Sequence, residues 1–203
     1  MESISRIINS TKSFTYSSYR DLVVRLSETG STTGAEQTPE KIEATKLNAH
    51  RMKRIEKQIQ IKEELVQQIK NIKRKWIWTV LVEAWCGDGA QVVPVIAKMA
   101  SLNPNIDLKI ILRDENPDIM DKHLSNGARS IPILICEDEM TNKEIDVWGS
   151  RPKKITEMAK DFKSANPNVS HDEFIKHLHL WYAKDRGEAI QNDFLQLIPF
   201  WNK

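Results

Sequence analysis

Residues 76–97 read Trp76-Ile-Trp-Thr-Val-Leu-Val-Glu-Ala-Trp-Cys-Gly-Asp-Gly-Ala-Gln-Val-Val-Pro-Val-Ile-Ala97, and this segment is the most informative about the fold. Its residues 77–82 are a short apolar run rich in β-branched side chains, which predicts a buried strand. Cys86 follows shortly afterwards, and a helix that contains Pro94 is expected to begin there. A cysteine at the first turn of a helix lies among free N–H groups at the positive end of the helix dipole, which favours the thiolate. The stretch therefore predicts a strand-to-helix turn that carries a candidate nucleophile.

A second apolar run follows Ser130-Ile131-Pro132 and predicts another strand. Strands and helices are expected to alternate throughout residues 76–163. The expected strands are 77–82, 108–112, 133–136 and 145–148, and the expected helices begin near Cys86, cover 117–124 and begin near Pro152. A β-α-β unit followed by two strands and a helix predicts an α/β domain, with a mixed central sheet flanked by helices.

Residues 1–75 predict a helical N-terminal extension, whose first dozen residues read as a loose terminus. A first amphipathic helix is expected to end at Gly30. A long polar helix should follow Thr38 and Pro39, which are typical of an N-cap and a first helical position. A third helix is indicated by apolar residues at helical spacing, namely Leu65, Ile69 and Ile72.

Residues 164–203 predict a C-terminal helical extension with a break near Gly187. Its apolar side chains recur at helical spacing, in Phe174, Leu178, Trp181 and Tyr182. We expect this stripe to pack on the core. The alternative is a surface for a partner, because aromatic residues near a terminus also serve as interface anchors.

The composition limits the classes of partner. With 203 residues, 40% of them hydrophobic, the chain can build one core of ordinary size and a small helical annex. Its 30 basic and 28 acidic residues leave a net charge of +2, which gives no reason to expect nucleic acid or an anionic membrane as a partner. There is no apolar run of the roughly 20 residues that a membrane span needs. Two cysteines without an export signal predict a cytoplasmic protein.

Four markers in the chain resemble the thioredoxin superfamily. They are Trp85-Cys86-Gly87, the helix proline Pro94, the stretch from Gly127 to Pro132, and Gly149 before the last helix of the domain. The resemblance covers residues 76–163 and implies a thioredoxin-like fold with a cis Ile131–Pro132 bond. It also implies that the backbone of Ile131 pairs with an extended substrate.

A narrower resemblance rests on two motifs. Trp-Cys-Gly-Asp-x-Ala-Gln at 85–91 and Arg-Asp-Glu-Asn at 113–116 are similar to bacterial thioredoxin-like proteins that have a single motif cysteine and a helical N-terminal extension. This resemblance implies a bacterial protein, but it adds more about fold than about activity.

The chain departs from dithiol thioredoxins at two positions. Gly89 stands where the second motif cysteine is expected, and Val80 stands where the family buries an aspartate that moves protons. Cys136 lies four residues past Pro132 on a strand that should run away from the site, about 13 Å beyond the proline. A disulfide needs Cα atoms within about 7 Å, so we expect Cys136 to belong to the core and the internal dithiol cycle to be absent.

The neighbours of Cys86 are the candidate substrate-binding residues. Trp85 would shield one side of the sulfur, and Gly87 would allow a partner's backbone to approach. The carboxylate of Asp88 disfavours the thiolate, although it can also interact with the first N–H groups of the helix. The sequence leaves the balance between these effects open. It also leaves open that Cys86 is an inert small residue in a fold without redox function.

Arg113 and Arg129 are candidate contacts for an acidic group of a thiol or a partner, and ordinary surface arginines are at least as compatible with the pattern. The five histidines form no convincing metal-binding set, so we expect no metal. The leading hypothesis is a monothiol thiol–disulfide oxidoreductase. In it, Cys86 exchanges disulfides with a thiol-containing or disulfide-bearing protein and a low-molecular-weight thiol, without a cofactor. The alternative is a non-catalytic binding module that holds a protein partner with the groove at Ile131 and Pro132 and with the helical extension.

Overall fold

The computed structural model describes residues 12–203, so the expected loose terminus lies outside the described residues except for its last position. Its centre is a four-stranded sheet in the order β2-β1-β3-β4. The strands are β1 (Trp76–Val82), β2 (Ile106–Leu112), β3 (Ile133–Asp138) and β4 (Lys143–Gly149). β1 is parallel to β2 and antiparallel to β3, which is antiparallel to β4. All four predicted strands are present, each slightly longer than expected.

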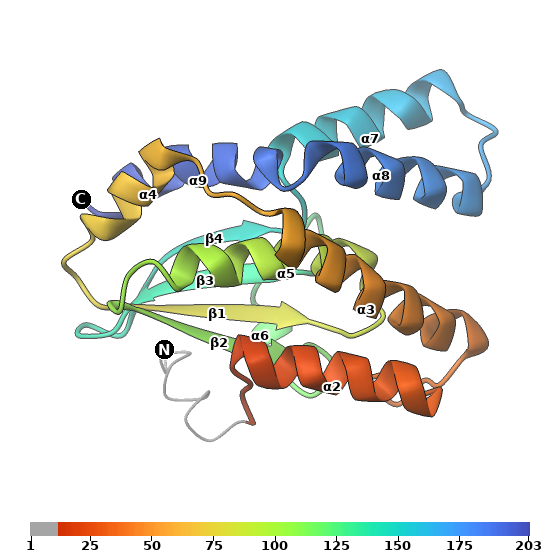
Figure 1. Cartoon of the computed structure of the whole chain (residues 1–203), viewed down its shortest axis with the longest axis horizontal. Helices are drawn as coiled ribbons and strands as arrows, with labels where there is room; N and C mark the ends of the chain where they lie inside the picture. The colour runs from red at the N-terminus through yellow and green to blue at the C-terminus, as the bar shows by residue number, and fades with distance from the viewer. Residues whose placement is uncertain (1–11) are drawn as a thin grey trace.

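β1 lies between β2 and β3 and is buried along its whole length. Helix α5 (Gly87–Ala100) follows it and lies against the sheet (Figure 1). Helix α7 (Lys153–Ala165) begins after Pro152, as expected. Helix α6 (Pro117–Met120) is shorter than the predicted range of 117–124. The prediction was too long because tight turns follow Met120, and Asn126 and Gly127 then adopt the left-handed conformation.

The N-terminal region forms three helices, α2 (Tyr16–Thr29), α3 (Pro39–Gln58) and α4 (Glu63–Lys70). Gly30 ends α2 in the left-handed conformation, with φ of 66°, which glycine adopts without steric cost. The Thr38 side chain accepts a hydrogen bond from the N–H of Lys41 and so caps α3. These local features match the sequence-based expectations.

Helices α2 and α3 pack on the sheet domain and not only on each other. Tyr19 and Val23 of α2 and Met52 and Ile55 of α3 are buried. The Asn48 amide donates a hydrogen bond of 2.8 Å to the carbonyl oxygen of Ala84, just before the Cys86 turn. The N–H of Ala84 donates one of the same length to the Thr33 hydroxyl. The N-terminal helices therefore hold the segment that leads into the turn.

Two helices complete the chain, α8 (His171–Asp185) and α9 (Glu188–Trp201), with left-handed residues at the predicted break. Trp201 and Phe194 of α9 pack edge-on against Trp78 of β1, so α9 covers one face of the sheet. Figure 1 shows α8 beside α7, extending past the end of the sheet near the start of α5.

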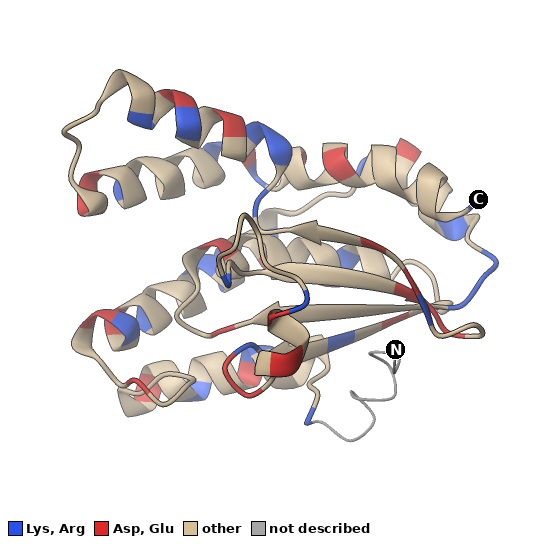
Figure 2. Cartoon of the chain, turned by 180° about the vertical axis from the view of Figure 1, so that it is seen from behind, with Lys and Arg blue, Asp and Glu red and all other residues tan. Residues whose placement is uncertain are grey.

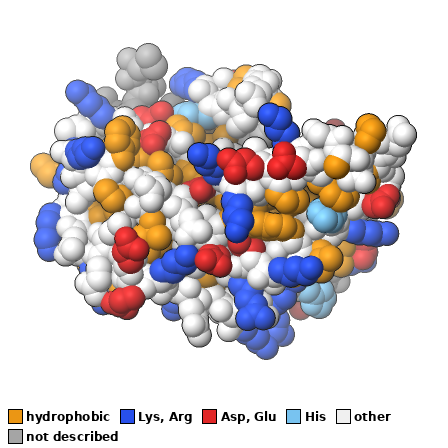
Figure 3. Space-filling model, turned by 90° about the horizontal axis from the view of Figure 1, so that it is seen from above, with side chains coloured by type: hydrophobic (Ala, Val, Ile, Leu, Met, Phe, Trp, Pro, Cys, Tyr) orange, Lys and Arg blue, Asp and Glu red, His pale blue; other side chains and the backbone are white. Residues whose placement is uncertain are grey.

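Lys and Arg are interspersed with Asp and Glu along the outer helices in Figure 2, and Figure 3 shows both signs side by side on another face. This mixture agrees with the near balance of charge in the sequence. Among residues 12–203, no helix combines the length and the apolar character that crossing a membrane requires.

Candidate functional site

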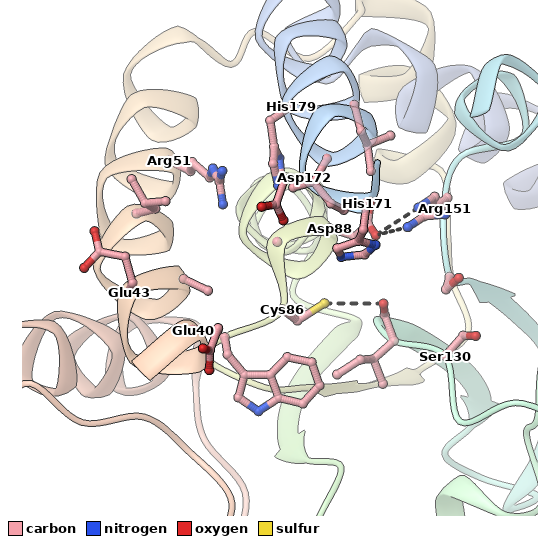
Figure 4. Close-up of a pocket in the computed structure, with 18 of the residues that line it drawn as sticks. Glu40, Glu43, Arg51, Cys86, Asp88, Ser130, Arg151, His171, Asp172 and His179 are labelled. Carbon is pink, nitrogen blue, oxygen red and sulfur yellow. Dashed lines mark hydrogen bonds and ion pairs between the residues drawn. The ribbon is translucent and has the colours of Figure 1, made fainter. Parts of the chain in front are cut away.

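Cys86 is the N-cap residue of α5, and its side chain is turned toward the cis-proline segment (Figure 4). The sulfur accepts a hydrogen bond of 3.2 Å from the N–H of Gly89, and the thiol donates one of 3.4 Å to the carbonyl oxygen of Ile131. The Ile131–Pro132 bond is cis, as the resemblance implied. The structure thus brings together Cys86, Ile131 and Pro132, which are far apart in the sequence.

The position of the missing second cysteine has no room for a side chain. A Cβ atom built on Gly89 would lie 2.4 Å from the Cγ2 atom of Val82. Cys136 is fully buried in β3 opposite Trp78, and both cysteines are free thiols. The prediction that Cys136 belongs to the core is therefore confirmed, and residues 12–203 provide no resolving thiol at the motif.

The surroundings of Cys86 favour the thiol over the thiolate. Only 6% of the residue is exposed, and this burial is the main cause that raises the pKa of Cys86 to about 12, with the charge of Asp88 as the next cause. The N–H of Gly89 acts in the opposite direction but does not compensate. The sequence left open whether the helix N-terminus or Asp88 has the larger effect on Cys86, and in this arrangement the thiol is the favoured form.

Asp88 is held by two residues that sequence reasoning did not select. One carboxylate oxygen accepts a hydrogen bond of 2.7 Å from the Tyr182 hydroxyl of α8, and the other accepts one of 2.9 Å from Nε of Arg151. A further Arg151 nitrogen lies 2.8 Å from the same oxygen. We call Asp88, Arg151 and Tyr182 the Asp88 clasp. It ties the first turn of α5 to α8 and to the segment before α7.

Two cations lie over the ring of Trp85. The Lys41 ammonium is 4.8 Å and the Arg113 guanidinium 4.9 Å from its ring centroid. Arg113 also forms an ion pair with Asp114 and donates a hydrogen bond to the carbonyl oxygen of Arg129. Arg129 is paired with Asp121. Both predicted anion contacts therefore lie near the site, but each already has a carboxylate partner.

The space above Gly87 is occupied by residues from both helical extensions. A Cβ atom at Gly87 would lie 2.7 Å from the His179 imidazole of α8 and 3.6 Å from Nη1 of Arg51 of α3. The prediction that Gly87 gives a partner's backbone close access is thus modified, because parts of this chain fill that space. The pKa of His179 is lowered to about 4, first by burial and then by neighbouring arginines, so its imidazole is neutral near pH 7.

These groups line a cleft of about 750 Å³ that extends from Trp85 and Cys86 to the facing sides of α3 and α8. Seven of the eight residues that the sequence singled out line this cleft, and the eighth, Pro132, is bonded to the lining residue Ile131. Sequence reasoning missed Arg51, Arg151, His179 and Tyr182. Among the described residues, no group of three or more His, Cys, Asp or Glu side chains is placed to hold a metal ion.

Comparisons with known proteins agree with this architecture. Two solved structures resemble the chain. One is an HIV epitope scaffold, with a TM-score of 0.57, 18% identity, and coverage of 87% of this chain and 96% of the scaffold. The other is a protein of unknown function from Pseudomonas aeruginosa, with a TM-score of 0.56, 20% identity, and coverage of 92% of this chain and 98% of that one. Such identities show the fold alone.

No curated protein matches the chain. A family model described as thioredoxin matches residues 34–163, a range that includes the Cys86 turn, the cis-proline segment and all four strands. Together with the mixed sheet and its flanking helices, this match shows that the chain belongs to the thioredoxin family and has a thioredoxin-like fold.

Proposed function

We propose that this protein exchanges disulfides through Cys86 alone, acting on a mixed disulfide between a target protein and a low-molecular-weight thiol. The observation that carries the proposal is the position of the Cys86 sulfur, between the N–H of Gly89 and the carbonyl oxygen of Ile131 at the wall of a cleft. The resemblance to thioredoxins implies that the backbone of Ile131 pairs with an extended substrate, and the Cys86 sulfur lies next to this backbone. The single motif cysteine supports a monothiol mechanism, and we place the protein among bacterial cytoplasmic thioredoxin-like proteins as part of this proposal.

The reaction has two balanced steps. The Cys86 thiolate attacks the small-thiol sulfur of the mixed disulfide, a new Cys86–small-thiol disulfide forms, and the target sulfur leaves as a thiolate that takes up a proton. A second molecule of the small thiol then attacks as its thiolate, releases the small-molecule disulfide and restores Cys86. One mixed disulfide and one thiol become one target thiol and one small disulfide, so no further oxidant or reductant is required.

The pKa of about 12 places a condition on this chemistry. Because burial is the largest cause of the raised pKa, opening the cleft to solvent would lower it. We expect an open arrangement of α3 and α8 to be the reactive one, since only 6% of the Cys86 residue is exposed in the arrangement described.

The test uses a cysteine-containing peptide joined by a disulfide to 2-mercaptoethanol, with excess 2-mercaptoethanol as the second thiol. The protein should accelerate release of the peptide thiol, Cys86→Ser should abolish the acceleration, and Cys136→Ser should retain it in folded protein. Reduction of insulin with a thioredoxin reductase should not be catalysed, because Gly89 supplies no second thiol. Loss of turnover in folded Cys136→Ser, or an internal Cys86–Cys136 disulfide, would show the monothiol mechanism to be wrong.

A second candidate is a non-catalytic binding module, favoured by the burial and raised pKa of Cys86. Iodoacetamide distinguishes the two, because it alkylates thiolates. Alkylation of Cys86 in the native protein on the same time scale as peptide release supports exchange. A sulfur that stays unmodified until the protein unfolds, in a protein that still binds a partner, supports the binding module.

A further inference from the structure

We propose that the cleft selects a small thiol that carries a carboxylate, and that Arg51 is the residue that binds this group. The inference deepens the proposed function by naming the substrate class of the same site. It rests on the placement of Arg51 beside the first turn of α5 and on the distribution of charged side chains around the cleft.

Arg51 projects from α3 into the space beside Cys86. Its Nη1 atom is 3.6 Å from where a Cβ of Gly87 would stand, and Figure 4 shows its guanidinium directed toward His179 across the cleft. Since Gly87 directly follows Cys86 and consecutive Cα atoms are 3.8 Å apart, the Nη1 atom of Arg51 lies within about 12 Å of the sulfur. A small thiol with a few bonds between its sulfur and its carboxylate can direct the sulfur to Cys86 and the carboxylate to Arg51 within this limit.

Arg51 differs from the other arginines that line the cleft. Arg113, Arg129 and Arg151 form ion pairs with Asp114, Asp121 and Asp88. Within residues 12–203, Arg51 has no ion pair with a carboxylate, and the hydrogen bond of its Nη1 goes to the neutral side chain of Asn48 at 2.7 Å. Its positive charge therefore remains available to a ligand.

The nearest groups make this charge costly to leave unpaired. Arg54 lies one helical turn further along α3, where its Nη2 donates to Gln91 and its buried Nε atom has no partner. The pKa of Arg51 is lowered by burial and then by the charge of Arg54, while the charge of Asp88 acts in the opposite direction without compensating. The N-terminus of α5, with its positive dipole end, faces the same space. An anion at Arg51 would be attracted by its own guanidinium, by the charge of Arg54 and by the positive end of the α5 dipole.

Carboxylates also line the cleft, but they are more exposed than Arg51. Glu40, Glu43 and Asp172 are exposed, near the N-terminal ends of α3 and α8, whereas Arg51 is half-buried. Asp88 is already occupied by the Asp88 clasp. Besides these exposed acids, the cleft therefore presents one half-buried cation that has no carboxylate partner within residues 12–203.

The experiment separates binding from chemistry by using Cys86→Ser, which cannot form a disulfide. Two symmetric disulfides of similar size and opposite charge serve as probes, 3,3′-dithiodipropionate and cystamine, and their dissociation constants are measured by calorimetry. Dithiodipropionate should bind at least about tenfold tighter than cystamine. Adding Arg51→Gln should weaken its binding about tenfold, while Arg25→Gln, an exposed arginine of α2 outside the cleft, should change it less than about twofold.

Each outcome decides the question. Equal or tighter binding of cystamine, no measurable binding of dithiodipropionate, or an unchanged constant in folded Arg51→Gln would overturn the anion site. Because the exchange test above uses uncharged 2-mercaptoethanol, it is independent of this result. If Cys86→Ser binds dithiodipropionate but the unmodified protein catalyses no exchange, the anion site is supported and the proposed function is rejected. If the unmodified protein catalyses exchange but Cys86→Ser binds both probes equally, the proposed function is supported and the anion site is rejected.

Discussion

Asp88→Asn should make Cys86 more acidic and more reactive. The substitution keeps the shape of the side chain, and its amide oxygen still accepts the Tyr182 hydroxyl, but it removes the negative charge that is the second cause of the raised Cys86 pKa. It also frees Arg151, whose positive charge already lowers that pKa, from its ion pair. Both changes favour the thiolate.

The size of the decrease in the Cys86 pKa follows from these causes. Burial, the largest cause, stays in place, so the pKa should fall from about 12 without reaching the value of a free thiol. A nearby charge commonly shifts a pKa by about 1–3 units, so we expect a decrease of about 1–2 units. Each unit means tenfold more thiolate below the pKa, which predicts alkylation about 10- to 100-fold faster. The lost ion pair should destabilise the fold by about 1–3 kcal/mol, since hydrogen bonds to charged groups contribute that much.

The assay is the rate of iodoacetamide alkylation as a function of pH, with folding checked by circular dichroism. Tyr182→Phe is the matched control, because it removes the hydrogen bond to Asp88 but keeps the charge and its ion pair. Its pH midpoint should stay near that of the unmodified protein. A midpoint in Asp88→Asn that does not decrease, or equal acceleration in both variants, would refute the reasoning and attribute reactivity to local opening.

Three further predictions concern stability. The fold should lose stability below pH 6.5, because His179 has a pKa of about 4 in the folded protein and therefore takes up its proton first in the unfolded chain. Urea unfolding midpoints should fall less between pH 6.5 and 4 in His179→Asn than in the unmodified protein. An equal fall would contradict the lowered pKa of His179. Above pH 9 Cys86 ionises in the unfolded chain, while the folded thiol keeps its proton until about pH 12. The free energy of unfolding should therefore fall by about 1.4 kcal/mol per pH unit because of this group. Cys86→Ser should remove that part of the pH dependence, and an unchanged dependence would argue against a buried thiol. Asn48→Ala should cost about 1–3 kcal/mol by leaving the buried Ala84 carbonyl oxygen without its donor, and an unchanged unfolding midpoint would show that α3 does not support the Cys86 turn.

Much of the fold could be predicted because its signals are local. Gly30 ends a helix because glycine adopts the left-handed conformation easily, and Thr38 starts one because its hydroxyl accepts from a free N–H. The buried strand β1 and the cis-proline segment are likewise readable from short stretches. The prediction failed at residues 121–124, where helix-compatible residues form turns that lead to the left-handed pair Asn126 and Gly127.

The site could be predicted only in part. Cys86 and Ile131 were identified from the motif, but their neighbours come from segments that no spacing rule connects. Arg151 and Tyr182 lie 63 and 94 residues from Asp88 along the chain. Tyr182 was assigned to a packing stripe, and its burial is correct, but its hydroxyl has a second role that periodicity does not reveal. Arg51 lies on a polar helix among many charged residues, so only the packing of α3 beside Gly87 distinguishes it.

The helical extensions therefore supply several of the residues that surround Cys86. His179 and Arg51 fill the space above Gly87, Tyr182 holds Asp88, and Asn48 holds the segment before the turn. Burial is the largest cause of the raised pKa, and α3 and α8 form the walls of the cleft over the sulfur. We expect that a movement separating these helices would expose the thiol and lower its pKa, because burial is the largest cause of the raised value. In that case access to the cleft and the acidity of the sulfur would depend on the same contacts.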